Sequence, residues 1–258
     1  MTPTFSFVSI NLNNSDGLLR TIESINRQSF QDWEHIIQDG GSTDSFKDVI
    51  RTFPDTRRRV TSEKDAGIYD AMNKALETAL GTFIWFINSG DELRDSETLA
   101  YVDESQRNLG WMWAYGALEM LDKNLEVKYI EATRRVNLRR VLLGLETYPH
   151  PSTIINTDFL RKIGGFQPEF APASDQELLI RMERVSIPCY LDRPIARFEP
   201  AGSSKGHNPR SYEYLFRDIR FRHTKKSAIG YAVDRGYMEA RILYRNLSGL
   251  RNRRASRD

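Results

Sequence analysis

Residues 83–92 read FIWFINSGDE, a run of apolar and aromatic side chains that passes directly into an amide, a hydroxyl, a glycine and the carboxylate of Asp91. The apolar run predicts a buried β-strand over Thr82–Ile87. Polar groups packed into the next four positions indicate a turn at the end of that strand. The stretch therefore predicts a rigid strand that supports a polar site at its end. The alternative is an ordinary turn in which Asp91 caps the next helix.

Predicted strands and helices alternate on the N-terminal side of this stretch. Leu18, Leu19, Ile22 and Ile25, for example, recur at helical spacing after a β-rich run. Such alternation implies a parallel, doubly wound α/β sheet, in which ligands bind beyond the carboxyl ends of the strands. The predicted strands are Phe5–Asn11, Trp33–Gln38, Arg59–Ser62 and Thr82–Ile87, and the predicted helices are Asp16–Arg27, one beginning near Ser45, one carrying Ile68 to Ala79, and Ser96–Leu109.

The pattern changes after about Trp111, where strands follow one another and antiparallel pairing becomes possible. From Ser211 onward the chain is predicted to be helical, with interruptions near Gly230 and Gly236. The predicted elements in between are the strands Trp111–Leu121, Glu126–Glu131, Ser152–Asn156 and Pro188–Phe198, the helix Gln176–Arg184 and the loop Pro200–Pro209.

Composition limits the class of protein. The chain has 258 residues, which fits one large domain or one domain with a helical appendage, and its 40% of hydrophobic residues can fill a sizeable core. No apolar run reaches about 18 residues, so no transmembrane helix is expected. The first residues read as a strand and not as a signal peptide. The single cysteine, Cys189, excludes an internal disulfide and indicates the reducing cytoplasm.

Charge is distributed unevenly along the chain. From Lys205 to the end, 14 Lys and Arg stand against 5 Asp and Glu, so this part carries about +9 and the remainder about −7. The acidic front suits a metal ion or a polar ligand, and the basic tail suits an anionic surface. Nucleic-acid binding is not expected, because the basic residues lie in one tail without a recognisable reading module.

Acidic residues follow the predicted parallel strands. Asp39 opens the turn DGGSTD, in which glycines let the backbone approach a flat ligand and a carboxylate can accept from a base or ribose. The alternative there is an ordinary turn with Asx and Ser caps. Asp65 suits a nucleotide contact or a helix N-cap. Asp91 suits Mg²⁺ or Mn²⁺, which take carboxylates and substrate phosphates as ligands.

Further candidates lie on later segments. Asn73 and Lys74 fall opposite the apolar stripe of the third predicted helix, where they approach a diphosphate or form a solvated face. Asp175 begins a helix, either as a general base or as a residue favoured by the helix dipole. His150, presented by the rigid segment YPHP, is a site residue or a structural histidine, and His207 is a metal ligand or simply exposed.

Together these segments resemble glycosyltransferase family two, the inverting enzymes of the GT-A fold, from about Phe5 to Ser204. The blocks that carry the resemblance are SFVSINLNN, SINRQSFQDWEHIIQDGGSTD, SEKDAGIYDAMNKALETALGTFIWFINSGD, HPSTIINTDFLRKIGGF and ASDQELLIR, in this order. The variant EKDAGIYDAMNKA followed by FINSGD looks most like bacterial transferases that build exopolysaccharide, capsule, O-antigen or glycolipid.

The resemblance implies a mostly parallel, Rossmann-like GT-A sheet flanked by helices. The implied domain spans residues 1–210, with a nucleotide-sugar-binding half (1–110) and an acceptor and catalytic half (111–210). A basic helical extension (211–258) would follow. The implied donor is a nucleoside diphosphate sugar, by analogy a UDP-sugar. Its implied contacts are Asn13, Asp39, Gly40, Asp65, Asn73, Lys74, Asn88 and Ser89.

The stretch Asn88–Asp91 takes the place of the family's Asp-x-Asp metal motif. Asn88 and Gly90 stand where relatives usually have acids, so Asp91 alone remains. Either Asp91 holds Mn²⁺ or Mg²⁺ with phosphate oxygens and water, with His207 as a second candidate ligand, or metal dependence is weak. Gly40 also replaces an acid that often contacts the base, which leaves the base specificity open.

Asp175 matches the family's acid that deprotonates the acceptor, here a hydroxyl of a glycan or of a lipid-linked molecule. His150 and Ser204 are the candidate acceptor contacts. The extension 211–258 would lean on an anionic membrane surface, at the inner face of the plasma membrane, or pack on the core or on a second subunit.

Two other classes stay open. A non-catalytic nucleotide-sugar-binding module would fit the missing acids. A nucleotidyltransferase would share the α/β start, but the chain has no early glycine-rich phosphate loop.

Overall fold

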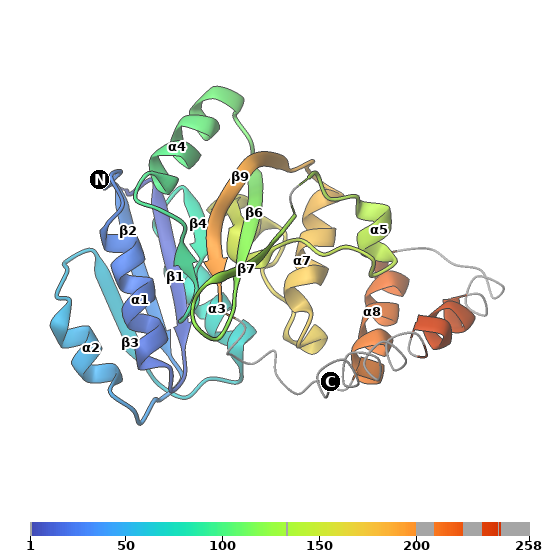
Figure 1. Ribbon diagram of the computed structural model, residues 1–258, viewed down its shortest axis with the longest axis horizontal. Helices are drawn as coiled ribbons and strands as arrows, with labels where there is room; N and C mark the ends of the chain where they lie inside the picture. Colours follow the sequence, from blue (N-terminus) through green and yellow to red (C-terminus); the bar gives the residue numbers. More distant parts are fainter. Residues whose placement is uncertain (1, 133, 200–208, 224–233, 242, 244–258) are drawn as a thin grey trace.

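A mixed β-sheet with helices packed against it forms the fold (Figure 1). The computed structural model of the protein describes residues 2–132, 134–199, 209–223, 234–241 and 243. Within these residues the expected α/β architecture is confirmed.

The first half of the sheet is parallel, as the alternating sequence pattern predicts. It contains β1 (Phe5–Asn11), β2 (Trp33–Asp39), β3 (Arg58–Ser62) and β4 (Phe83–Phe86). β1 pairs in parallel with β2 on one side and with β4 on the other, and β2 pairs in parallel with β3. Every residue of β1, β2 and β4 is buried, which is typical of central parallel strands covered on both faces.

The second half of the sheet is mixed. It contains β5 (Glu92–Leu93), β6 (Trp113–Leu121), β7 (Val127–Glu131), β8 (Thr153–Asn156) and β9 (Cys189–Phe198). β8 lies antiparallel between β4 and β6, whereas β6 and β9 run parallel. The strand order is β3-β2-β1-β4-β8-β6-β9-β5, and β7 pairs with β6 in the expected antiparallel manner. The sheet as a whole therefore has parallel pairing mainly in its N-terminal half.

The helices form two groups along the chain. Those between the first strands are α1 (Ser15–Asn26), α2 (Phe46–Thr52), α3 (Ile68–Thr78) and α4 (Thr98–Leu109). The later ones are α5 (Leu138–Leu142), α6 (Thr157–Lys162), α7 (Ser174–Glu183) and α8 (Pro209–His223), with short 3₁₀ turns at His150–Ser152 and Pro168–Phe170. α5 and α6 were not predicted, because five or six residues are too few for a clear helical period.

The core lies on both faces of the sheet. Alternate residues of β1 point to opposite sides, so Phe5 and Phe7 join one cluster while Val8 and Ile10 join the other. One cluster packs under α3, α6 and α7, and the other contains Trp85 with apolar residues of α4. Burial on both faces explains why these strands read as continuous apolar runs.

The described part of the C-terminal region is packed on the rest of the fold. Ile219 of α8 is fully buried in the core, and Arg220 forms an ion pair with Asp234 (3.0 Å). The predicted interruption near Gly236 is wrong, because residues 234–241 form a continuous helix. Residue 230 lies outside the described residues. No helix in the described part of the chain is both long and apolar enough to cross a bilayer.

Candidate active site

The side chain of Asp39 ties the carboxyl ends of β1, β2 and β3 together. Its carboxylate accepts hydrogen bonds from Asn11 Nδ2 (2.7 Å), Ser62 Oγ (2.6 Å) and the Ser42 N–H (2.9 Å), and also from the Ser42 hydroxyl. Burial alone would raise the pKa of Asp39, but these hydrogen bonds outweigh burial and lower the pKa. An ionised, well-bonded Asp39 therefore fixes this edge of the sheet. Its predicted contact with a donor stays a prediction.

A second carboxylate, Asp65, lies against the same turn. Its Oδ2 is 3.0 Å from the position that a Cβ on Gly40 would take, and its Oδ1 accepts from the Gly67 N–H (2.9 Å). A side chain at position 40 would crowd this carboxylate, so glycine keeps the approach close. Leu12, at the end of β1, is 60% exposed and borders the same spot at 3.4 Å. Sequence analysis missed Leu12, because an exposed leucine gives no signal in a pattern.

Two asparagines fix the loop after β1. Asn13 has a φ of 49°, in the left-handed region that asparagine tolerates. Its N–H donates to Ser42 Oγ (2.7 Å), and its Oδ1 accepts from the Thr43 N–H (2.8 Å). The Asn14 side chain donates to the Ser89 carbonyl oxygen (2.9 Å). The loop is therefore joined both to the turn after β2 and to the turn after β4.

Hydrogen bonds also preorganise the turn Asn88–Asp91, which follows β4. The Ser89 N–H donates to the Ile10 carbonyl (3.2 Å), and Asn88 Oδ1 accepts from the Ile10 N–H (3.3 Å). The Thr21 hydroxyl of α1 donates to the Asp91 carbonyl (2.7 Å). Ser89 Oγ is buried and has no hydrogen-bond partner among the described residues. The turn therefore has a fixed backbone and one buried hydroxyl that is available to a ligand group.

Another acid, Glu199, reaches this turn from far along the chain. β5 pairs antiparallel with β9 and places Glu92 opposite Arg197. As a result, Glu199 Oε2 lies 3.6 Å from the position that a Cβ on Gly90 would take. Sequence analysis missed Glu199, because a strand of two residues does not reveal its pairing.

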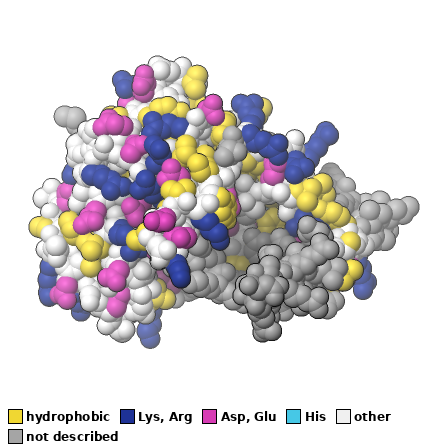
Figure 2. All heavy atoms as spheres, in the orientation of Figure 1, with side chains coloured by type: hydrophobic (Ala, Val, Ile, Leu, Met, Phe, Trp, Pro, Cys, Tyr) yellow, Lys and Arg dark blue, Asp and Glu magenta, His cyan; other side chains and the backbone are white. Residues whose placement is uncertain are grey.

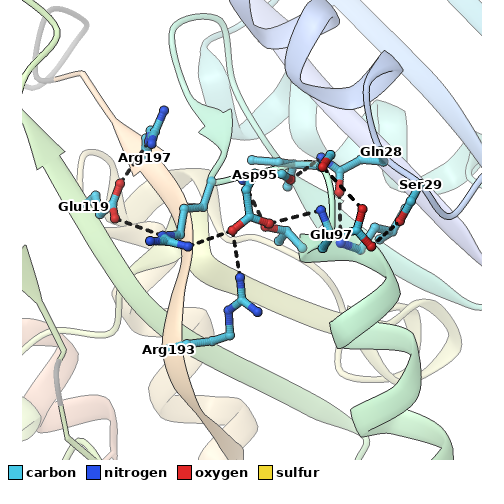
Figure 3. Close-up of polar contacts among 12 residues, drawn as sticks. Gln28, Ser29, Asp95, Glu97, Glu119, Arg193 and Arg197 are labelled. Atoms are coloured by element: carbon cyan, nitrogen blue, oxygen red, sulfur yellow. Dashed lines mark hydrogen bonds and ion pairs between the residues drawn. The ribbon is translucent and has the colours of Figure 1, made fainter.

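Charged side chains secure the junction between β5 and β9 (Figure 3). Glu119 of β6 accepts from Arg94 (3.0 Å) and from Arg197 (2.9 Å). Asp95 accepts from Arg193 (2.8 Å) on β9. This network holds the segment after Asp91 against the strand that leads to Glu199.

Asp91 lies in an unusual electrostatic environment. Burial raises the pKa of Asp91 well above its usual range, a backbone hydrogen bond from Asn88 opposes that shift, and the nearby Glu199 adds to it. Arg20 of α1 offsets part of the negative charge through ion pairs with Glu92 (3.6 Å) and with Glu199. Arg27 also forms an ion pair with Glu92 (3.8 Å), whereas Asp91 has no ion pair among the described residues.

The residues of this turn fit a divalent cation that is shared with a ligand. Within the described residues, no three or more His, Cys, Asp and Glu side chains are grouped to hold a metal ion by themselves. Mg²⁺, however, is commonly held by one or two carboxylates together with substrate phosphates. Asp91 and Glu199 are two carboxylates near this turn that repel one another, and a cation would relieve this repulsion.

The predicted base Asp175 begins α7 and is held by hydrogen bonds. The Tyr69 hydroxyl of α3 donates to its Oδ1 (3.1 Å) and shares this hydrogen with the Pro172 carbonyl (2.8 Å). Gln176 Nε2 donates to the other oxygen, Oδ2 (3.3 Å). α3 also follows directly after Asp65, so this helix links the region of β2 to Asp175.

His150 lies beside Asp175. Burial lowers the pKa of His150, and the Asp175 carboxylate opposes that shift. The imidazole packs against Phe86 and Phe166, with ring centroids 5.7 and 5.8 Å apart, and its Nε2 has no hydrogen-bond partner in the described part of the chain. Phe86 is two positions before Asn88, so His150 stands close to the turn that follows β4.

Two predicted donor contacts on α3 make other interactions. Asn73 Nδ2 donates to the Phe166 carbonyl (3.0 Å) and Asn73 Oδ1 accepts from the Phe166 N–H (2.9 Å), so this side chain fastens α3 to the loop before α7. Lys74 forms ion pairs with Asp70 (3.2 Å) and Glu63 (3.7 Å). Their donor contacts remain predictions.

The predicted residues thus lie along connected strand ends and helix starts. Asp39 ends β2, Asp65 follows β3, and Asn88 and Asp91 follow β4. Asp175 is connected to this region by its hydrogen bond with Tyr69. Ser204 and His207 lie outside the described residues. Two surface hollows of about 450 Å³ lie elsewhere, one lined by residues such as Phe53 and Arg58 and the other by residues of the β6–β7 hairpin.

The chain matches the family described as glycosyl transferase family 2 over residues 6–142. It is 28% identical over 249 residues to the uncharacterized glycosyltransferase Rv1514c of Mycobacterium tuberculosis, an alignment that covers 94% of this chain and 92% of the relative.

Solved structures agree with this fold. The chain superposes on S. aureus TarS in complex with UDP-GlcNAc with a TM-score of 0.71 and 18% identity, over 95% of this chain and 73% of that one. It superposes on the mannosyltransferase PcManGT of Pyrobaculum calidifontis, in complex with GDP-Man and Mn²⁺, with a TM-score of 0.61 and 16% identity, over 94% and 70%. At these identities the likeness shows the fold alone, and it confirms the expected GT-A architecture.

Proposed function

The chain belongs to glycosyl transferase family 2, and from this premise we propose that it transfers a sugar, with inversion, from a UDP-sugar to a hydroxyl group. The acceptor would be a glycan or a lipid-linked molecule of a bacterial cell-surface polysaccharide or glycolipid. One observation carries the proposal above the others: α3 starts beside the predicted donor contact Asp65 and places Tyr69 within hydrogen-bond distance of the predicted base Asp175.

The donor would lie along the carboxyl edge of β1, β2 and β4. Leu12, Gly40 and Asp65 would contact the nucleoside, since they lie together where β1 and β2 end. The diphosphate would meet the turn after β4, where Ser89 has a buried hydroxyl without a partner among the described residues. TarS, which shares the fold, binds UDP-GlcNAc, and this supports the choice of a UDP-sugar.

Asp91 and Glu199 would hold a Mg²⁺ or Mn²⁺ ion together with the diphosphate oxygens. When bound, this ion supplies positive charge that stabilises the leaving nucleoside diphosphate. PcManGT binds Mn²⁺ with its sugar nucleotide, which supports a cation in this fold. Arg20 already balances part of the charge of Glu199 and so limits the repulsion at the site before a cation binds.

Asp175 would act as the general base. It takes the proton of the acceptor hydroxyl while the acceptor oxygen bonds to the anomeric carbon. The bond from that carbon to the diphosphate breaks, and its electron pair leaves with the nucleoside diphosphate. Tyr69 and Gln176 each donate a hydrogen bond to one oxygen of the Asp175 carboxylate. These bonds would hold the carboxylate in one orientation towards the acceptor hydroxyl.

His150 would position the acceptor. Its Nε2 is a buried polar atom without a partner among the described residues, and its ring packs against Phe86 and Phe166, whose own rings are in contact (centroids 5.1 Å apart). A hydroxyl of the acceptor would satisfy this nitrogen. Buried polar atoms are usually hydrogen-bonded, so this unpaired nitrogen supports a polar ligand group at this position.

Release of UDP tests the proposal. Purified protein is first screened by thermal shift with nucleoside diphosphate sugars and Mn²⁺, because a ligand at 100 times its dissociation constant stabilises by about 2.7 kcal/mol. The sugar nucleotide that stabilises the protein is then incubated with candidate acceptors. We expect acceptor-dependent release of UDP and an inverted anomeric product. Stabilisation without any turnover would instead favour a non-catalytic binding module.

A further inference from the structure

Exposed leucines bordered by arginines form a distinct surface around α5. We call it the Arg–Leu surface, and it comprises Arg134, Arg135, Arg139, Leu143 and Leu145. Leu143 is 41% and Leu145 is 50% exposed, and the arginines are exposed as well. Figure 2 shows hydrophobic side chains over α5 with Lys and Arg side chains beside them. This combination is typical of surfaces that enter the interface of a lipid bilayer.

The leucines are held outward by a fixed backbone. The Leu143 carbonyl accepts from Tyr237 Oη (2.9 Å) and from Arg241 Nη1 (2.7 Å). The Leu145 N–H donates to the Arg140 carbonyl (2.8 Å). Gly144, between the two leucines, adopts a φ of 65°. The exposure of these side chains is therefore built into the fold, and it leaves apolar area in water that a partner would cover.

Positive charge at this surface exceeds its local compensation. Glu146 accepts from Arg140 Nε (2.6 Å) and from Arg134 Nη2 (3.3 Å), so one carboxylate serves two arginines. Arg135 and Arg139 have no ion pair with a carboxylate among the described residues. Residues 134–146 contain four arginines and one acid, a net charge of +3. The partner that fits this surface therefore carries negative charge as well as apolar area.

We propose that the Arg–Leu surface docks the protein on an anionic lipid bilayer. Arginines near such a surface each contribute about 1 kcal/mol of attraction, and leucines add burial in the acyl region. The membrane contact thereby moves from the predicted extension 211–258 to α5. In the described part of that extension, Tyr237 and Arg241 bond to Leu143 and so support the Arg–Leu surface from behind.

The Arg–Leu surface also connects to the site. Tyr148, which follows it, exchanges two hydrogen bonds with Gln176: its N–H donates to Oε1 (3.1 Å) and its carbonyl accepts from Nε2 (3.0 Å). Gln176 in turn contacts Asp175. Resting on the proposed function, docking at this surface would bring the transferase to acceptors that carry a lipid anchor.

Co-sedimentation of the full chain with vesicles tests the proposal. Wild-type protein is expected to bind vesicles of phosphatidylcholine mixed with phosphatidylglycerol and to bind pure phosphatidylcholine much less. The variant Arg135→Gln/Arg139→Gln should lower the partition coefficient about 25-fold, from about fivefold per arginine. The control Arg51→Gln/Arg107→Gln removes the same charge from exposed positions on α2 and α4 and should bind like wild type.

Three results would overturn the docking proposal: equal binding to both vesicle types, equal loss in the control variant, or unchanged binding of Arg135→Gln/Arg139→Gln. A second variant, Leu143→Ser/Leu145→Ser, should also weaken binding, and its thermal unfolding shows whether it is folded. UDP binding in the presence of Mn²⁺ is measured in parallel without lipid. If UDP binds neither the wild type nor any of the variants, the proposed function is contradicted. The vesicle data would still test the docking surface independently.

Discussion

The Tyr69 hydroxyl donates a hydrogen bond of 3.1 Å to Oδ1 of Asp175, although the two residues are 106 positions apart in the chain. The ring of Tyr69 stacks on Phe166, with centroids 5.6 Å apart, so the hydroxyl has little freedom to move. The carboxylate is thereby oriented by a residue from the N-terminal half of the fold. We infer that Tyr69 positions the general base of the proposed reaction.

Replacing Tyr69 with phenylalanine removes this hydrogen bond together with the one to the Pro172 carbonyl (2.8 Å), and it keeps the stacked ring. A hydrogen bond to a charged group is worth about 1.5–3 kcal/mol, so kcat should fall roughly 10- to 100-fold. The KM for the donor should change little, because among the described residues the Tyr69 hydroxyl bonds to Pro172 and Asp175 and not to Leu12, Gly40 or Asp65. Tyr129→Phe, which removes an exposed hydroxyl on β7, is the matched control. Equal kcat in Tyr69→Phe and wild type would show that Tyr69 does not position the base.

Asp175→Asn removes the proposed base with little change of shape. General-base help is worth roughly 10²–10⁴-fold, and turnover should fall by about that range while donor affinity is retained. Asp192→Asn, at an exposed position of β9, serves as control. Turnover and calorimetric donor binding are compared for the same preparations. Normal turnover of Asp175→Asn would remove this residue from its proposed role.

Asp91→Asn and Glu199→Gln each replace a carboxyl group at or beside the turn after β4 with an amide. Both variants should weaken the Mn²⁺-dependent part of the UDP affinity by at least about tenfold, because one carboxylate fewer would bind the cation less tightly. The larger loss is expected for Asp91→Asn. Calorimetry with Mn²⁺ and with EDTA separates that part from metal-independent binding. The control is Asp158→Asn, whose side chain is 92% exposed. An unchanged Mn²⁺ effect in both variants would argue against a cation at this turn.

Burial of His35 makes stability depend on pH. Burial lowers the pKa of His35 from 6.5 to about 3, and Arg58 adds to that shift. The imidazole stays neutral: Arg58 Nε donates to its Nδ1 (3.4 Å), and its Nε2 lies 2.8 Å from Ser9 Oγ. Because the unfolded chain binds this proton more readily, the free energy of unfolding should fall as the pH drops from 6.5 towards 3.

The slope due to His35 is about 1.4 kcal/mol per pH unit at most. Denaturant unfolding between pH 7 and about 4.5 measures it. Glutamine in His35→Gln cannot be protonated in this range. The slope of the free energy of unfolding against pH should therefore be smaller than in wild type, by the contribution of about one proton. Parallel pH curves for the two proteins would mean that His35 does not titrate as described.

The parallel half of the fold could be predicted from sequence because each strand is buried on both faces. β1 was predicted to the residue, since all seven of its side chains are buried. Asp91 was recognised as a site residue because a carboxylate at the end of an apolar strand stands out. β5, α5 and α6 escaped prediction because their periods are too short to detect.

Contacts between segments that lie far apart in the chain could not be predicted from the sequence. Glu199 reaches Gly90 only because β9 pairs with a strand of two residues, and Tyr69 reaches Asp175 only because α3 and the loop before α7 pack together. Tyr69 was visible in the motif GIYDAMNKA, but nothing in that motif says which carboxylate its hydroxyl meets. Such pairs depend on tertiary packing, which local patterns do not encode.

A crystal structure with UDP and Mn²⁺ tests the central claim most directly. We expect the uracil and ribose beside Leu12, Gly40 and Asp65, and the diphosphate with its Mn²⁺ at the turn Asn88–Asp91. UDP bound instead in the hollow next to Phe53 and Arg58, with the turn after β4 free of ligand, would contradict the proposed donor site.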